Sequence, residues 1–357
     1  MNTRVMVETS HYLYIEFMET KKLKEQILSL PVAQRERLLK EIEDSTKNID
    51  LSAIVSRRHE FDNKLGACPH CSHPKYVRFG MDKGAQRYKC NSCHRSFTEY
   101  TGTWMAGLQR KDKIADYLKL MVEEKSLDKI VSALGINKKT AFDWRHKILA
   151  SLGADDGDDF TGITESDETF FLSSEKGMEV KNRKPRKRGG KSSKRGVSND
   201  QVAVIVTQDR NSGIDLSVAT LGRIGKADIA NAIGKRIKKG STILCSDSHH
   251  SYKGFAKDTK VEFHPINVSK GERVKGAFHV QHVNSTHNRI KKWIGSTFWG
   301  VSTKYLQQYL NWHALKEKIK SNRETTAAFA QQTLGVGALK RFANIQPNYE
   351  KLISTQC

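Results

Sequence analysis

The sequence of 357 residues contains no long hydrophobic run. A helix that crosses a membrane needs roughly 18 or more consecutive apolar residues, and no segment approaches that length. The first ten residues, MNTRVMVETS, also lack the basic and then apolar pattern of a secretory signal. We therefore expect a soluble, intracellular protein with no membrane partner.

Acidic residues are in short supply. The chain has 39 Asp and Glu against 61 Lys and Arg, which gives a formal net charge of +22. A surplus of this size makes a chain repel itself unless it binds a polyanion. Nucleic acid is therefore the first candidate partner. A chain of this length can also form two or three domains, each with its own core.

Cysteine is scarce, and its placement is informative. Of six cysteines, four form two Cys-x-x-Cys pairs with 18 residues between the pairs. This spacing is typical of a zinc ribbon, in which two short turns bring four thiolates to one tetrahedral ion. Disulfides are the alternative, but they are rare in intracellular proteins. Cys245 and Cys357 stand apart and are expected to be free thiols. The predicted ligands of a structural Zn²⁺ are Cys68, Cys71, Cys90 and Cys93.

After the ribbon, residues 111 to about 150 have helical periodicity. Leu127, Ile130, Val131 and Leu134 form an apolar stripe that follows a capping residue, Ser126. A glycine-bearing turn at 135–137 separates this helix from a second one, which begins at residue 138. The pattern is that of a helix-turn-helix, although an ordinary helical hairpin is the alternative. The candidate DNA contacts here are Lys138, Lys139, Thr140 and Arg145.

Two charged stretches follow. Residues 154–159 are acidic and broken by glycine, which indicates a domain boundary. Residues 181–195 contain nine Lys or Arg together with glycine and serine, which predicts a flexible loop. Such a run either lies on a solvated surface or binds a phosphate backbone. The candidate DNA contacts in it are Arg183, Lys184, Arg186, Lys187 and Arg188.

The second half of the chain has an α/β pattern. Strands are predicted at 162–171, 202–206, 214–221, 241–247 and 261–263, and helices at 226–238 and from about 284. This order indicates one layer of mixed sheet with flanking helices.

Acids interrupt two of these strands. The first contains Glu165, Asp167 and Glu168, and the strand at 241–247 ends on Asp247. Adjacent strands can bring Asp167 and Asp247 close together, and such a pair is stable only with cations between the carboxylates. Oxygen ligands favour Mg²⁺ or Mn²⁺. Two such ions can serve an in-line phosphoryl transfer. The alternative for the first strand is a solvated acidic edge.

A third acid is missing where one would be expected, because no Asp or Glu occurs between Gly276 and Lys316. Asn284 and Lys291 are seven residues apart and share one face of the predicted helix. An amide oxygen can bind Mg²⁺, and a lysine can hold phosphate. The surrounding histidines (249, 250, 279, 282 and 287) suggest DNA contact or substrate positioning, with a second zinc site as the alternative. The nearby aromatic residues (293, 298, 299, 305, 309 and 312) are expected to pack in the core.

Four motifs in this half point to a family: SDET at 166–169, SDSHHSY at 246–252, HVN at 282–284 with Lys291, and GVSTKYLQQYL at 300–310. Together with the ribbon and helical N-terminal half, they resemble the bacterial insertion-sequence transposases of the group numbered fifteen ninety-five, whose catalytic domain is called ISXO-like. The resemblance implies a ribonuclease-H-like fold and DDE-type chemistry. It makes Asp167 and Asp247 the first two metal ligands, Asn284 the third and Lys291 an accessory lysine. Most DDE enzymes have Glu in the third place, but branches of this family resemble the present chain in having Asn.

We therefore expect a DNA transposase that binds the terminal repeats of its element and joins them to target DNA. Pairing of two ends implies a homodimer or a larger assembly on double-stranded DNA, in the cytoplasm of a bacterium and associated with its nucleoid. A DNA-binding regulator and a structure-specific nuclease are the alternatives. The expected domains are a helical region (1–60), the zinc ribbon (61–104), the helix-turn-helix (105–153), the catalytic domain (160–320) and a helical tail (321–357).

Overall fold

The computed structural model describes residues 25–37, 52–152, 158–179, 190, 192, 194–267, 270–320, 325–333 and 337–354. The chain divides into two compact units, Met1–Ser52 and Ala53–Cys357. In the first unit, residues 25–29 and 32–37 are helical, on either side of Pro31. Leu38, Leu39 and Ile42, which belong to the helical region expected at 1–60, lie outside the described residues.

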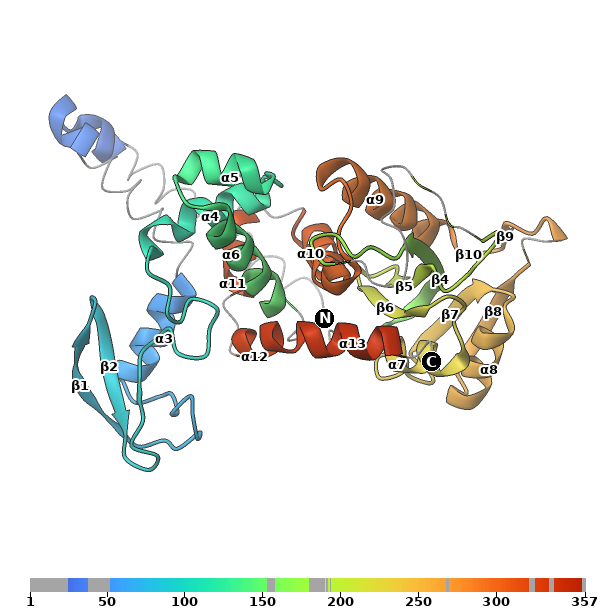
Figure 1. Cartoon of the computed structure of the whole chain (residues 1–357), viewed down its shortest axis with the longest axis horizontal. Helices are drawn as coiled ribbons and strands as arrows, with labels where there is room; N and C mark the ends of the chain where they lie inside the picture. Colours follow the sequence, from blue (N-terminus) through green and yellow to red (C-terminus); the bar gives the residue numbers. More distant parts are fainter. Residues whose placement is uncertain are drawn as a thin grey trace, which may run out of the picture. The chain divides into compact units, whose positions relative to one another are not determined.

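The ribbon is a small sheet with an aromatic core. Its four aromatic rings (Phe61, Tyr76, Tyr88 and Phe97) are buried, and their centroids lie 5.2 to 5.9 Å apart. They are needed because a sheet this small has few other apolar residues to bury. The sheet order is β1-β2-β3, with antiparallel pairing throughout (Figure 1). The elements are α3 (Ser52–Asp62), β1 (Tyr76–Asp82), β2 (Ala85–Cys90) and β3 (Ser96–Phe97).

The helices that follow begin and end as their capping residues dictate. The Ser126 side chain accepts the N–H of Lys129 at the start of α5, as predicted. Gly135 ends α5 in the left-handed conformation, with φ of 57°. The Asn137 side chain then accepts the N–H of Thr140 at 2.7 Å and starts α6. The elements are η1 (Lys111–Lys113), α4 (Ile114–Val122), α5 (Leu127–Leu134) and α6 (Lys138–Ser151).

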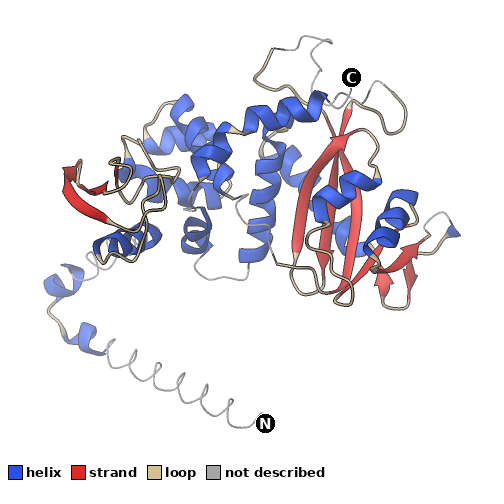
Figure 2. Cartoon of the chain, turned by 90° about the horizontal axis from the view of Figure 1, so that it is seen from below, coloured by secondary structure: helices blue, strands red, loops and turns tan. Residues whose placement is uncertain are grey.

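A five-stranded mixed sheet forms the second half, which confirms the predicted α/β layer. The strand order is β6-β5-β4-β7-β8. The pairs β6-β5 and β5-β4 are antiparallel, whereas β4-β7 and β7-β8 are parallel. Figure 2 shows these long strands side by side with helices packed against them. The strands are β4 (Gly162–Leu172), β5 (Gln201–Asp209), β6 (Ile214–Leu221), β7 (Thr242–Asp247) and β8 (Glu262–Ile266).

Helices cover both faces of this sheet. On one face, α7 (Lys226–Ile233) and α8 (His250–Thr259) bury Ile229, Ile233, Tyr252 and Phe255 against Ala203, Ile205 and Leu244. The opposite face receives α9 (Gln281–Thr297), which packs on β4 and β5. The predicted helix at 226–238 is too long. Gly234 follows Ile233, and the chain turns there, although Ile237 remains buried in the same core.

The aromatic residues between Trp293 and Trp312 pack as predicted, with one exception. Trp293, Tyr309 and Trp312 are buried, and Trp312 is only 1% exposed. The exception is Trp299, which is 62% exposed and lies in the left-handed conformation just after α9. The prediction that this side chain belongs to the core is therefore wrong, because the chain turns outward at that residue.

The described tail is helical and folds back on the helical region before the sheet. Arg341 Nε donates to the carbonyl oxygen of Ala150 at 2.8 Å, which joins α12 to the end of α6. No helix in the part of the chain that the structure describes is long and apolar enough to cross a membrane. The remaining elements are β9 (Val274–Lys275), β10 (Phe278–His279), η3 (Thr303–Tyr305), α10 (Leu306–Ile319), α11 (Thr325–Thr333), α12 (Ala338–Ala343) and α13 (Ile345–Ser354).

Candidate functional site

The two aspartates predicted to be catalytic lie on neighbouring strands in the centre of the sheet. The parallel pairing of β4 with β7 runs from Gly162 opposite Thr242 to Glu165 opposite Cys245, a constant offset of 80 residues. The same offset puts Asp167 level with Asp247, since 167 + 80 = 247. Alternate residues of a strand share a face, so both aspartates lie on the face that α9 covers. The register alone therefore brings them together.

The electrostatics of Asp167 support this proximity. Burial, together with the negative charges of Glu168 and Asp247, raises the pKa of the Asp167 carboxyl to about 8, although the Glu168 N–H and the charge of Lys291 act to lower it. Burial and Asp247 likewise raise the pKa of Glu168 to about 7. Three carboxyl groups thus repel one another here, and Lys291 offsets only part of that repulsion.

These carboxyl groups fit a hard divalent cation. Backbone N–H groups reach one oxygen of each aspartate, from Glu168 to Asp167 Oδ1 and from His249 to Asp247 Oδ1, both at 3.0 Å. Glu168 Oε2 is buried with no hydrogen-bond partner among the described residues. Carboxylate oxygens in excess of their cationic partners are a donor set that suits Mg²⁺ or Mn²⁺. Glu168 was not among the predicted catalytic residues, although its place in the acid cluster was the available signal.

Helix α9 carries the other two predicted residues. Asn284 and Lys291 are both exposed. Lys291 is close enough to Asp167 to lower the pKa of that carboxyl. Between them His287 is 8% exposed, and its Nε2 atom has no hydrogen-bond partner among the described residues. Burial, together with the charge of Lys291, lowers the pKa of His287 to about 4, against an opposing interaction with the Asp167 backbone. His287 is thus the histidine that lies against Asp167.

His279 and His282 have a different partner, the fully buried carboxylate of Glu165. His282 Nδ1 lies 2.6 Å from Glu165 Oε1, and His279 Nδ1 lies 3.2 Å from the same oxygen. The backbone N–H of His282 donates to Oε2 at 2.9 Å. Sequence reasoning noted Glu165 only as part of an acid cluster. The signal that it missed is an acid at the centre of a strand, where its neighbours Thr164 and Ser166 are buried as well.

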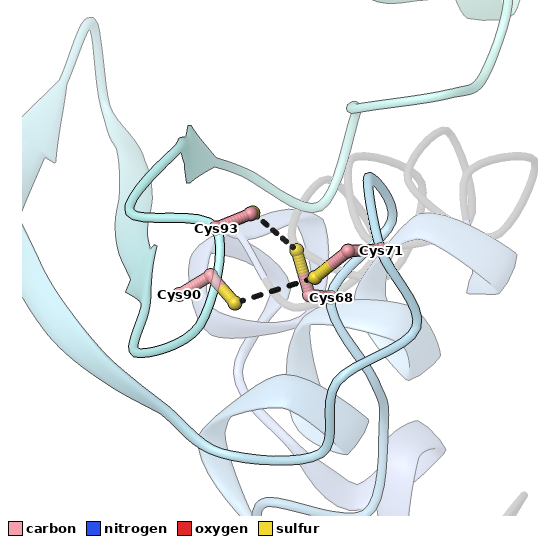
Figure 3. A group of neighbouring side chains, drawn as sticks. All are labelled: Cys68, Cys71, Cys90 and Cys93. Carbon is pink, nitrogen blue, oxygen red and sulfur yellow. Dashed lines mark hydrogen bonds between the residues drawn. The ribbon is translucent and has the colours of Figure 1, made fainter.

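The four predicted zinc ligands converge, as Figure 3 shows. Cys68 Sγ lies 3.7 Å from Cys93 Sγ, and Cys71 Sγ lies 3.6 Å from Cys90 Sγ. All four sulfur atoms lie within 4.8 Å of one another. Zinc–sulfur bonds of about 2.3 Å in a tetrahedron require sulfur atoms about 3.8 Å apart. Although burial opposes the shift, backbone N–H groups of Cys93 and Ser92 and the neighbouring thiols lower the pKa of Cys90 to about 7. The cluster can therefore bind zinc.

The predicted DNA contacts on α6 divide into two groups. Lys138 and Lys139 are exposed at the start of the helix, and Thr140 is half-buried. Lys138 Nζ also pairs with Asp128 at 2.7 Å. Arg145, in contrast, is 1% exposed, donates to the carbonyl oxygen of Lys125 at 2.6 Å and lies over the Trp312 ring at 5.7 Å. Its prediction as a DNA contact is therefore corrected, because its guanidinium is buried inside the protein.

The other predicted DNA contacts lie outside the described residues. They are Arg183, Lys184, Arg186, Lys187 and Arg188. The acidic link is described only at 158–159, and Cys357 is also outside. Cys245 is a buried free thiol, as predicted, and burial raises its pKa to about 11.

Parts of this chain are similar to known proteins. Residues 160–317 match the family model described as the ISXO2-like transposase domain. A relative from Halobacterium salinarum, described as an uncharacterized protein in transposable element ISH50, is 28% identical over 262 residues, which cover 71% of this chain and 85% of the relative.

Two solved structures were also matched. The pre-cleavage Mos1 transpososome is 9% identical, with a TM-score of 0.24, over 67% of this chain and 77% of that one. The Mos1 strand transfer complex is 10% identical, with a TM-score of 0.20, over 60% and 77% of the two chains. Both superpositions are loose. The family match and the relative from a transposable element agree with the motifs and confirm the resemblance: residues 160–317 are similar to the ISXO2-like transposase domain.

Proposed function

We propose that this protein is a DNA transposase of the DDE type, in a variant with asparagine in the third position. It binds the terminal repeats of its insertion sequence, cuts the phosphodiester at the element end and transfers the freed 3′-hydroxyl to target DNA. The observation that carries the proposal is the register of β4 against β7, which sets Asp167 beside Asp247 within a domain of a transposase family.

In this proposal, Asp167, Asp247 and Asn284 hold Mg²⁺ or Mn²⁺, and Lys291 holds a phosphate of the DNA. The ions, when bound, would activate the attacking oxygen and stabilise the leaving one. The raised pKa of Asp167 supports a cation-binding role, because a bound cation favours the ionised carboxylate that burial and repulsion disfavour. Lys291 acts on the same carboxylate from α9, which supports its place beside the reacting phosphate.

The sheet order is consistent with the ribonuclease-H-like fold that the family implies. Three antiparallel strands followed by two parallel ones, with an acid on each of the two central parallel strands, suit that assignment. We further propose that α5 and α6 form a helix-turn-helix that reads the element ends through Lys138, Lys139 and Thr140. The four cysteines would hold a structural Zn²⁺.

The proposed division of the chain keeps the ribbon at 61–104, the helix-turn-helix at 105–153 and the catalytic domain at 160–320. A helical region (1–60) and a helical tail (321–357) flank them. Joining two ends requires a dimer or a larger assembly on double-stranded DNA, which would act in the bacterial cytoplasm at the nucleoid.

A strand-transfer assay tests the proposal. The protein is mixed with a labelled element end and a target duplex, with and without Mg²⁺. We expect metal-dependent cleavage at the end and covalent joining to the target. Binding without cleavage would favour the DNA-binding regulator instead. Cleavage that never leads to joining would favour the structure-specific nuclease.

A matched pair of variants separates binding from chemistry. Asp167→Ala and Asp247→Ala are expected to abolish cleavage and joining while end binding persists, because these acids hold metal and do not contact the DNA bases. Binding is measured by gel shift on the same labelled end. A parallel loss of binding and cleavage would contradict the assignment.

A further inference from the structure

One buried carboxylate near the catalytic aspartates holds four segments of the fold together. Glu165 is 0% exposed and lies on β4, two residues before Asp167. Around it are Arg210 from the turn after β5, His279 from β10, and His282 with Val283 from the first turn of α9. We call Glu165, Arg210, His279 and His282 the Glu165 cluster.

The protons of this cluster can be assigned from its hydrogen bonds. Arg210 Nη2 lies 3.1 Å from His279 Nε2, and a guanidinium can only donate. His279 Nε2 is therefore the acceptor, which puts the ring proton on Nδ1, facing Glu165 Oε1 at 3.2 Å. The backbone N–H of Gln281 also approaches this Nδ1, at 3.3 Å, but a protonated Nδ1 cannot accept a hydrogen bond from it. His282 Nδ1 donates to Oε1 from 2.6 Å.

The second carboxylate oxygen of Glu165 accepts hydrogen bonds from the start of α9. Oε2 accepts the backbone N–H of His282 at 2.9 Å and that of Val283 at 3.4 Å. These amides belong to the first turn of α9, whose N–H groups have no partner within the helix. A carboxylate at this end also complements the helix dipole. Glu165 thus caps α9 from a neighbouring strand, and this contact accounts for a helix that begins at Gln281, three residues before the expected start.

Asn284 follows directly after the capped turn. We propose that Glu165 is a positioning residue for the catalytic centre: it fixes the first turn of α9 on β4 and thereby sets the distance of Asn284 from Asp167. The inference rests on the proposed function, because it requires Asn284 to bind the catalytic metal. It assigns a role to an acid that the reaction itself does not use.

The same three residues raise a rival interpretation. Ligand atoms of Glu165, His279 and His282 lie within 4.8 Å of one another, a grouping that can hold a metal ion. The contacts favour hydrogen bonds instead. Arg210 Nη2 lies 3.6 Å from Glu165 Oε1, so a positive charge is already present where the ion would lie. A metal on His279 Nδ1 would also put a proton on Nε2, facing the donor of Arg210.

The test compares Glu165→Gln with Asp209→Asn in the full-length protein. Asp209 is a suitable control because it is also buried in the sheet and also accepts backbone N–H groups, from Asn211 at 2.9 Å and Gly213 at 2.7 Å. Hydrogen exchange of the amides at 281–286 should accelerate roughly tenfold in Glu165→Gln and remain unchanged in Asp209→Asn.

Metal binding gives the decisive readout. Mn²⁺ titration followed by electron paramagnetic resonance should show affinity weakened roughly tenfold by Glu165→Gln, and about equally by Asn284→Ala. The double variant should bind no more weakly than Asn284→Ala, because Glu165 acts through Asn284. A purely structural role predicts additive losses that also occur in Asp209→Asn, and that result would overturn the inference.

Three further outcomes bear on the inference. If Glu165→Gln does not fold, His282→Ala removes one donor from a half-exposed ring and should weaken Mn²⁺ binding in the same direction; no change would overturn the inference. A second equivalent of zinc in the purified wild type, lost in His282→Ala, would overturn it in favour of the rival metal site. A wild type that neither binds Mn²⁺ nor cuts DNA would instead overturn the proposed function.

Discussion

Three acids around one point dominate the chemistry at the scale of single residues. Asp167, Glu168 and Asp247 share a small region in which burial disfavours the ionised forms of Asp167 and Glu168, and Lys291 compensates only part of the charge. If no cation were bound there, neutral residues at these positions would make the folded protein more stable. The arrangement therefore stores electrostatic repulsion that a bound divalent ion would relieve.

The pH dependence of stability follows from these shifts. The pKa of Asp167 is about 8 in the folded chain and about 4 when unfolded. The folded protein therefore binds more protons in that interval, and its stability should fall as pH rises from about 4 to about 8. Glu168 acts in the same direction. We expect the metal-free melting temperature to fall across this window, less steeply in Asp167→Asn, and Mg²⁺ to reduce the fall in the wild type. An equal slope in both proteins would contradict this account.

Asn284 brings an oxygen to the proposed metal site but no charge. We expect the wild type to need millimolar-range Mg²⁺ or to favour Mn²⁺, which binds such ligands more tightly. Asn284→Ala should nearly silence cleavage, whereas Asn284→Asp should tighten metal binding and retain part of the activity. Lys291→Ala should cost less than either aspartate change, because it holds phosphate.

Metal titrations of cleavage by these variants measure the effect. If Asn284→Ala cuts DNA at a normal rate, the third ligand lies elsewhere. His287 then becomes the residue to replace, because it lies against Asp167, while His279 and His282 face Glu165.

At the scale of elements, local signals predicted most of the fold. Ser126 and Gly135 predicted the two ends of α5, and the strands of the sheet lie where apolar runs in the sequence predicted them. Two of the failures, at Arg145 and at the start of α9, have a common cause, which is that tertiary contacts decided them. Arg145 looked like a surface residue of α6 but is covered by Trp312, and α9 starts early because Glu165 caps it. Neither contact can be read from nearby sequence, since the partners are more than a hundred residues apart in the chain.

The ribbon offers a prediction of its own. Cys68→Ser should release metal and unfold the ribbon, because small zinc modules owe their fold to the ion. Cys245→Ser is the control, since that thiol is also buried but lies in β7, away from the cluster. Zinc content is measured by atomic absorption, and folding of the ribbon by its backbone NMR signals. A freshly purified wild type without zinc, or an equal loss in both variants, would refute the assignment.

At the scale of the whole molecule, the protein has a formal net charge of +22, and its basic residues can contact DNA in two ways. Some contacts recognise a particular base sequence, and others bind the phosphate backbone of any DNA. The start of α6 offers few side chains, of which Lys138 is already paired with Asp128. The stretch 181–195 carries nine basic residues. We therefore expect α6 to recognise the DNA base sequence and the basic stretch to bind the phosphate backbone of any DNA.

The two roles can be separated by salt dependence. Changing Arg183, Lys184, Arg186, Lys187 and Arg188 to Gln should weaken binding to every DNA alike and lower the salt slope of log K by up to about 4. Changing Thr140 should alter which ends are bound and leave that slope intact. The control changes five exposed lysines of equal total charge to Gln, namely Lys235, Lys239, Lys253, Lys257 and Lys260. If net charge alone governs binding, the control will flatten the slope as much as the loop variant does, and the basic stretch would then have no special part in holding DNA.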